Sequence, residues 1–168
     1  MSSSEIQGWL TGRLPQGWFI GAPEIHVDGD EILVVGRLAE PELVAHGNPE
    51  TGSGAREARL EGFREQTREQ RMRIAQEAER RFGRKVSWGV SVGGKRRLFT
   101  TLSIPVMTRL RLPERQVLDT LVEAGVARSR SEALAWCVRL VGKHQADWIQ
   151  ELREALVKVG ELRRRGPA

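Results

Sequence analysis

One short stretch of the chain alternates arginine with leucine: Val106-Met107-Thr108-Arg109-Leu110-Arg111-Leu112-Pro113. Side chains alternate across a β-strand, so Met107, Arg109 and Arg111 would share one face, and the two leucines the other. Arginine binds guanine O6 and N7 in bidentate fashion, and the DNA major groove admits a two-stranded β-ribbon. The pattern predicts a strand that reads DNA bases and ends at a proline suited to a first helical turn.

The other residue types that carry chemistry do not form a recognisable site. Cys137 lies in an apolar segment and is predicted to be a core residue, and the three histidines, at positions 26, 46 and 144, lack metal-ligand spacing. No nucleophile–base arrangement or pair of catalytic carboxylates is evident, and Gly93-Gly94-Lys95 is too short for a phosphate-binding loop. We therefore expect neither an enzyme nor a bound metal or cofactor.

Composition predicts a soluble, folded protein in the cytoplasm. The 168 residues are 39% hydrophobic and 29% charged, which is typical of globular chains. No apolar run approaches membrane-spanning length, and the start Met-Ser-Ser-Ser-Glu is unlike a signal peptide. A single cysteine cannot build a disulfide framework. We expect no membrane contact, and a nucleoid association if the chain binds DNA.

Positive charge is concentrated in one half of the chain. Residues 93–168 hold 15 Lys and Arg against 8 Asp and Glu, a net charge of +7, whereas residues 1–92 carry −2. The excess coincides with the arginine-bearing strand and favours binding to phosphates. Basic proteins that touch no nucleic acid share this property, so charge alone does not decide the function.

Residues 1–104 predict a small α+β domain in the order helix, strand, strand, helix, strand, strand. The turn signals are Asp28-Gly29-Asp30 and Gly93-Gly94, and Gly83 closes the long helix. The predicted segments are a helix at 4–13, an irregular strand at 16–27, a strand at 31–38, a loop at 40–54, a helix at 55–82, and strands at 86–92 and 95–102.

The long helix and the second hairpin contain basic residues that could contact nucleic acid. In the helix, glutamates interleave with the basic residues Arg71, Arg73, Arg80 and Arg81. This pattern predicts a solvent-exposed face with many ion pairs. At the hairpin tip, Lys95-Arg96-Arg97 fits a phosphate contact and an ordinary soluble turn equally well.

The C-terminal half predicts three helices. The first spans 113–124 and ends at Gly125, and the second begins with a capping box formed by Ser129 and Glu132. Residues 133–141 contain one charge in nine, so this helix must be buried on nearly every side, which a partner subunit would achieve. The third helix, 145–163, carries a heptad seam and is predicted to pack against the dimer or the N-terminal domain. The domains are thus 1–104, 105–144 and 145–168.

Residues 106–143 resemble the ribbon-helix-helix (Arc/MetJ-like) family of DNA-binding proteins. The resemblance rests on Thr108-Arg109-Leu110-Arg111-Leu112-Pro113-Glu114, the glycine turn, and Arg128-Ser129-Arg130-Ser131-Glu132-Ala133-Leu134. It implies a homodimer whose paired strands enter the major groove of double-stranded DNA. The base-reading residues would be Met107, Arg109 and Arg111.

The resemblance also implies where phosphates and the partner subunit bind. The phosphate-binding residues would be Arg128, Ser129, Arg130 and Ser131, with Lys95, Arg96 and Arg97 as further candidates from the hairpin tip. The dimer core would contain Leu110, Leu112, Leu121, Leu134, Trp136, Cys137, Val138 and Val141.

Three functions remain open from the sequence. The first is a dimeric, sequence-specific transcriptional regulator. The second is an adaptor or antitoxin-like protein that binds a partner through residues 1–92, and the third is an RNA- or ribosome-binding protein that uses Lys95-Arg96-Arg97. In many ribbon-helix-helix proteins the strand lies near the N-terminus, whereas here a whole domain precedes it. That domain could hinder entry into the groove or bind an effector.

Overall fold

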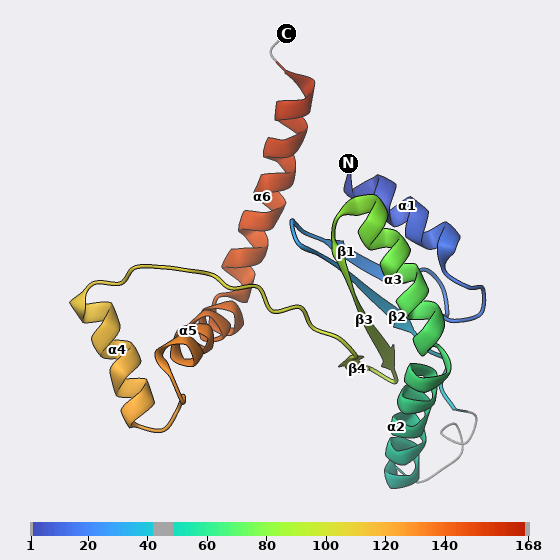
Figure 1. Ribbon diagram of the computed structural model, residues 1–168, viewed down its shortest axis with the longest axis horizontal. Helices are drawn as coiled ribbons and strands as arrows, with labels where there is room; N and C mark the ends of the chain where they lie inside the picture. The colour runs from blue at the N-terminus through green and yellow to red at the C-terminus, as the bar shows by residue number, and fades with distance from the viewer. Residues whose placement is uncertain (1, 42–48, 167–168) are drawn as a thin grey trace. The chain divides into compact units, whose positions relative to one another are not determined.

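The protein is described by a computed structural model that covers residues 2–41 and 49–166 and divides into two compact units, 1–105 and 106–168 (Figure 1). Helices and a four-stranded sheet together make the chain α+β, which confirms the predicted fold class.

The first unit contains one mixed sheet in the order β1-β2-β3-β4. The outer pairs are antiparallel hairpins, whereas the central strands β2 and β3 run parallel, with Val34 opposite Trp88. Parallel neighbours need a crossover connection, which α2 and α3 supply. The elements are α1 (Ser3–Arg13), β1 (Glu24–Val27), β2 (Glu31–Arg37), α2 (Pro49–Gln66), α3 (Arg68–Phe82), β3 (Lys85–Val92) and β4 (Lys95–Leu98).

The helices of the first unit pack on one face of this sheet. Alternate residues of β2 and β3 project from that face, as the two-residue period of a strand requires. α1 and α3 meet them in one cluster, and α2 closes a second cluster beside it. The buried members are Ile6, Leu10, Ile32, Val34, Ile74, Ala78, Phe82 and Trp88 in the first cluster, and Leu38, Leu60, Phe63, Val90 and Val92 in the second.

The predicted single helix over 55–82 is wrong, because the structure has two helices that separate at Thr67. In a continuous helix the Arg64 carbonyl would accept from the Arg68 amide. Here it accepts from Nη2 of Arg71 at 2.7 Å, and Thr67 Oγ1 donates to the Phe63 carbonyl at 2.6 Å. A threonine hydroxyl bonded to the carbonyl four residues back commonly bends a helix. Side chains therefore replace the backbone bond at this point.

Three other predicted boundaries also change. Residues 49–54 of the predicted loop 40–54 belong to α2, and residues 42–48, with His46, lie outside the described residues. The strand predicted at 16–27 is reduced to β1, because Gly17 and Gly21 adopt positive φ and turn the chain. The strand predicted at 95–102 ends at Leu98, and the following segment bonds back to the Trp88 carbonyl through the Phe99 amide at 2.7 Å.

Gly36 in β2 has no room for a side chain, because an added Cβ would overlap the Phe19 ring. The Ile20 amide donates to the Arg37 carbonyl at 2.7 Å and holds Phe19 against the strand. Gly36→Ala should therefore lower the free energy of unfolding by about 1–3 kcal/mol, the usual cost of overpacking. Urea unfolding followed by tryptophan fluorescence measures this value. As a control, Gly8→Ala in α1 meets open space and should stabilise the helix by up to about 1 kcal/mol. Equal urea midpoints for Gly36→Ala and the wild type would contradict the packing described.

The second unit contains α4 (Leu112–Glu123), α5 (Arg130–His144) and α6 (Ala146–Arg165). Gly125 adopts a φ of 74° after α4, and the Val126 amide donates to the Leu121 carbonyl at 2.9 Å, as expected of a glycine-terminated helix. α5 continues through Gly142 to His144. Figure 1 shows α6 starting directly after α5 with a change of direction.

Candidate nucleic-acid interface

The arginine-bearing segment is not a strand in the single chain. Residues 101–111 form neither helix nor strand, and Leu112 is already the first residue of α4. A β-strand requires a hydrogen-bonded neighbour, and none is present among the residues that the structure describes. The backbone at Arg111 is nevertheless extended, with φ −82° and ψ 176°. The segment thus keeps a strand-like conformation at its end without the pairing that would define a strand.

The three predicted base-reading side chains are all exposed. Met107 has 98% of its surface accessible, and both Arg109 and Arg111 are exposed. Within the described parts of the chain, neither arginine makes an ion pair. Leu110 packs against the small core of this unit, whereas Leu112 is 59% exposed. Leu110 therefore faces the core, as the predicted alternation of core-facing and outward-facing side chains requires. Leu112 does not face the core in the single chain.

The start of α5 is capped as predicted. Ser129 Oγ accepts from the Glu132 amide at 3.2 Å, and Glu132 Oε2 accepts from the Arg128 amide at 2.9 Å. The cap leaves the backbone N–H groups of Arg130 and Ser131 without an acceptor inside the helix. Such groups, with the positive end of the helix dipole, form a ready site for a phosphate.

Arg130 and Arg128 differ in what their side chains can bind. Arg130 makes a bidentate ion pair with Asp119 of α4, with nitrogen–oxygen distances of 2.6 and 2.7 Å. These hydrogen bonds raise the pKa of Arg130 and lower the pKa of Asp119, so both remain charged at neutral pH. The ion pair therefore links α4 and α5 and occupies the Arg130 guanidinium in the free chain, whereas the Arg130 amide has no acceptor inside the helix. The exposed side chain of Arg128 makes no ion pair in the described chain.

The extended segment lies beside this helix start. Val106, Met107 and Thr108 border a cavity of about 300 Å³, and Arg130 and Ser131 line it as well. Met107, one of the predicted base-reading residues, thus lies near Arg130 and Ser131, two of the predicted phosphate-binding residues, whereas Arg109 and Arg111 are not part of this lining.

Most of the predicted dimer core is not buried in the single chain. The core of the second unit consists of Leu118, Ala127 and Ala133, with Leu110, Leu121, Leu134 and Cys137 packed around it. Val138 is 66% exposed, Val141 is 48% exposed and Trp136 is half-buried. α6 contributes no buried residue at all within its described length. The expectation that residues 133–141 are buried on nearly every side is therefore not met without a partner.

The basic hairpin tip is neutralised within its own unit. Lys95 pairs with Glu57 at 3.5 Å, Arg96 with Glu24 at 3.3 Å, and Arg97 with Glu57 and Glu61. These exposed contacts compete with a phosphate for the side chains of Lys95, Arg96 and Arg97. Among the described residues, no cluster of three or more potential metal ligands occurs, and no helix is long and apolar enough to span a membrane.

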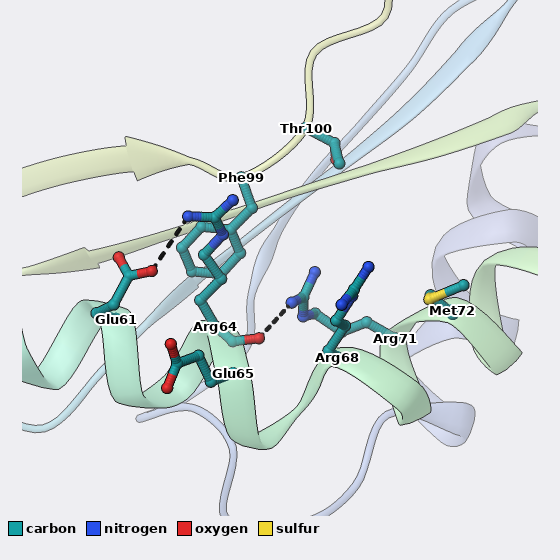
Figure 2. A pocket seen from close by; sticks show the side chains of 8 residues that line it. All are labelled: Glu61, Arg64, Glu65, Arg68, Arg71, Met72, Phe99 and Thr100. Atoms are coloured by element: carbon teal, nitrogen blue, oxygen red, sulfur yellow. Dashed lines mark hydrogen bonds and ion pairs between the residues drawn. The ribbon is translucent and has the colours of Figure 1, made fainter.

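A second cluster of arginines lies in the first unit, and the sequence did not reveal it. A cavity of about 560 Å³ is lined by Glu61, Arg64, Glu65, Arg68, Arg71, Met72, Phe99 and Thr100 (Figure 2). The prediction that Arg71 belongs to a solvated face is wrong, since its exposure is only 6%. The available signal was its position, because Thr67, Arg71, Ile74 and Ala78 share one helical stripe that is otherwise apolar or small.

Fold and surface together define a two-unit α+β protein with a basic helical C-terminal unit. Two family models match the chain in succession: the N-terminal domain of Rv1265-like proteins over residues 4–98, and the Mb1296 C-terminal domain over residues 111–163. The chain belongs to the Rv1265-like family. Met107 and Arg109 lie between the two matches, and Arg111 is the first residue of the second.

Close relatives are known from mycobacteria. The chain is 57% identical over 160 residues to the uncharacterized proteins Mb1296 of Mycobacterium bovis and Rv1265 of Mycobacterium tuberculosis. The match covers 95% of this chain and 69% of each relative. No solved structure matches the chain.

Proposed function

We propose that this chain is a dimeric, sequence-specific DNA-binding regulator of the ribbon-helix-helix type, and not an enzyme. One observation carries the proposal. Arg109 and Arg111 stand exposed and without ion pairs on a segment that ends in extended backbone, directly ahead of a helix pair whose apolar surface is uncovered. A second copy would supply both missing parts, a neighbouring strand for the segment and a cover for the helices.

The surface chemistry favours a second copy as the occupant of the apolar face. A groove of about 500 Å³ between α5 and α6 is lined by Cys137, Val138, Val141, Gly142, Ala146, Ile149 and Arg153. Exposed apolar patches of this kind mark interaction sites. In a ribbon-helix-helix dimer the same helix face pairs with itself, so each copy covers the other. Antiparallel pairing of the two segments would then place four arginines on one ribbon.

DNA is favoured over the other two candidate partners. The start of α5, whose free amides suit a phosphate, borders the same cavity as Val106, Met107 and Thr108 just before the arginines, which would suit a duplex held by its backbone and read by its bases. RNA binding through Lys95, Arg96 and Arg97 is disfavoured because glutamates already pair with all three. A regulator of this kind would act in the cytoplasm, at the nucleoid.

In vivo cross-linking followed by sequencing of the bound DNA tests this proposal with the full chain. We expect an enriched motif with two-fold symmetry, because a symmetric dimer presents the same ribbon to both halves of its site. A flat profile across the genome would contradict sequence-specific binding and leave a non-specific DNA-binding or partner-binding role.

A further inference from the structure

We propose that the cavity between α2, α3 and the segment after β4 binds a small molecule that carries a phosphate or pyrophosphate group. The inference concerns the first unit alone and does not depend on DNA binding by the second.

The first observation is a buried arginine without a carboxylate partner. Arg71 is 6% exposed, and it makes no ion pair with any described residue. Its Nε donates to Thr67 Oγ1 at 3.0 Å, its Nη2 donates to the Arg64 carbonyl at 2.7 Å, and its guanidinium lies 5.0 Å from the centroid of the Phe99 ring. Neutral acceptors and an aromatic face position the guanidinium but leave its charge uncompensated. A buried cation in this state favours an anion.

The second observation is that part of this guanidinium faces the cavity. Nη1 of Arg71 donates no hydrogen bond to the described residues. In the same part of the chain, no fully enclosed side-chain nitrogen or oxygen lacks a partner. Nη1 must therefore be accessible, and Arg71 lines the cavity. The N–H groups of Nη1 thus have no acceptor among the described residues, and they belong to a side chain that lines the cavity.

The third observation is the positive charge around Arg71. Arg64, Arg68 and Arg71 line the same cavity. Burial lowers the pKa of Arg71, and the charges of Arg64 and Arg68 lower it further. Arg68 is exposed and makes no ion pair in the described chain. Arg68 and Arg71, which make no ion pair among the described residues, lie at one opening and form a site suited to phosphate, whose oxygens accept bidentate hydrogen bonds from guanidinium.

The two carboxylates at the opening do not neutralise this site. Glu61 Oε1 lies 3.1 Å from Nη1 of Arg64, and Glu61 Oε2 lies 3.6 Å from Nη1 of Arg97. The carboxylate of Glu61 is therefore shared between these two arginines and does not pair with the buried Arg71. In Figure 2 the Glu65 carboxylate points away from the guanidinium groups of Arg68 and Arg71.

The remaining lining suits the rest of a small molecule. Thr100 Oγ1 accepts from the Trp88 amide at 2.9 Å, which leaves its hydroxyl hydrogen free to be donated. Met72 is half-exposed at the rim and Phe99 is half-buried. A volume of about 560 Å³ lies within the range of sites that bind cofactor-sized ligands. The cavity can therefore accommodate a phosphate together with an apolar or ring-shaped group.

Titration of the full chain with sodium pyrophosphate, followed by calorimetry and by the Arg Nε–H resonances in nuclear magnetic resonance spectra, tests the proposal. We expect saturable binding, a rise in melting temperature with pyrophosphate, and a shift of the Arg71 resonance. Arg68→Gln should weaken binding by about tenfold, the loss expected for one charge-assisted hydrogen bond. Arg68 is exposed, so this variant should fold normally.

The control variant is Arg80→Gln, which removes the same charge from an exposed position of α3 outside the cavity lining. Its pyrophosphate affinity should stay within about twofold of the wild type, because exposed charges that do not touch the ligand are screened by salt. Equal weakening by both variants would show diffuse attraction and overturn the proposal, as would no saturable binding. Stronger competition by a short oligonucleotide, at equal phosphate concentration, would identify a nucleic-acid surface instead and also overturn it.

Discussion

Replacing both Arg109 and Arg111 with alanine is expected to abolish the preference of the protein for its own DNA site while leaving the dimer folded. Each bidentate arginine–guanine contact contributes about 1–3 kcal/mol of discrimination, so each substitution should reduce the specificity ratio by roughly tenfold to a hundredfold. Both side chains are exposed and form no ion pair in the described chain, so their removal should cost little stability. The measurement is the ratio of affinities for a selected duplex and a scrambled one at fixed salt.

The control for this double variant is Arg163→Ala in the last turn of α6, which removes an exposed arginine far along the chain from the segment. Its specificity ratio should equal that of the wild type. The overall affinity of every arginine variant should fall slightly, because fewer counterions are released on binding. An unchanged ratio in the double variant would rule out base reading by this segment.

Val138→Asp is expected to break the dimer. In the single chain Val138 is 66% exposed, and an exposed substitution normally changes stability by less than about 0.5 kcal/mol. In the proposed dimer the same position lies in the interface, where an unpaired carboxylate costs about 3–5 kcal/mol. The dimer dissociation constant should therefore rise by at least about a hundredfold. Sedimentation velocity over a range of protein concentrations gives this constant directly.

The matched control is Gln116→Asp, which places the same carboxylate at an exposed polar position of α4. This variant should sediment like the wild type. If Val138→Asp also sediments like the wild type, then α5 does not form the subunit interface, and the apolar face has another partner. A loss of helical signal in both variants would instead indicate a folding defect in α4 and α5.

Local signals in the sequence predicted much of the fold correctly. The turn at Asp28-Gly29-Asp30 is formed by carboxylate hydrogen bonds, with Asp28 Oδ1 accepting from the amides of Asp30 and Glu31 at 2.8 and 2.7 Å. Gly83 ends α3 at a φ of 68°, and Ser129 caps α5. Each of these features is decided within a few residues, so the sequence pattern contains the information needed.

Features that depend on distant or longer-range contacts were not predictable in this way. The break at Thr67 requires the Arg71 side chain to take the Arg64 carbonyl, and no propensity scale includes that competition. The buried side chain of Arg71 and the cavity beside it also depend on Phe99, which follows β4 and is far from α3 in the sequence. The strand expected at 106–112 needs a neighbour that a single chain does not provide.

The parallel pairing of β2 with β3 also determines the order in which the first unit can be assembled during synthesis. α1 and then the β1–β2 hairpin leave the ribosome first, and the β2 edge that pairs with β3 stays open until the whole of α2 and α3 and then Lys85–Val92 have been made. An open strand edge is a template for wrong pairing. Domains fold as units while the chain emerges, so the nascent chain passes through an interval in which helices can cover one face of the hairpin, α1 first and then α2 and α3, while the β2 edge still lacks its partner strand.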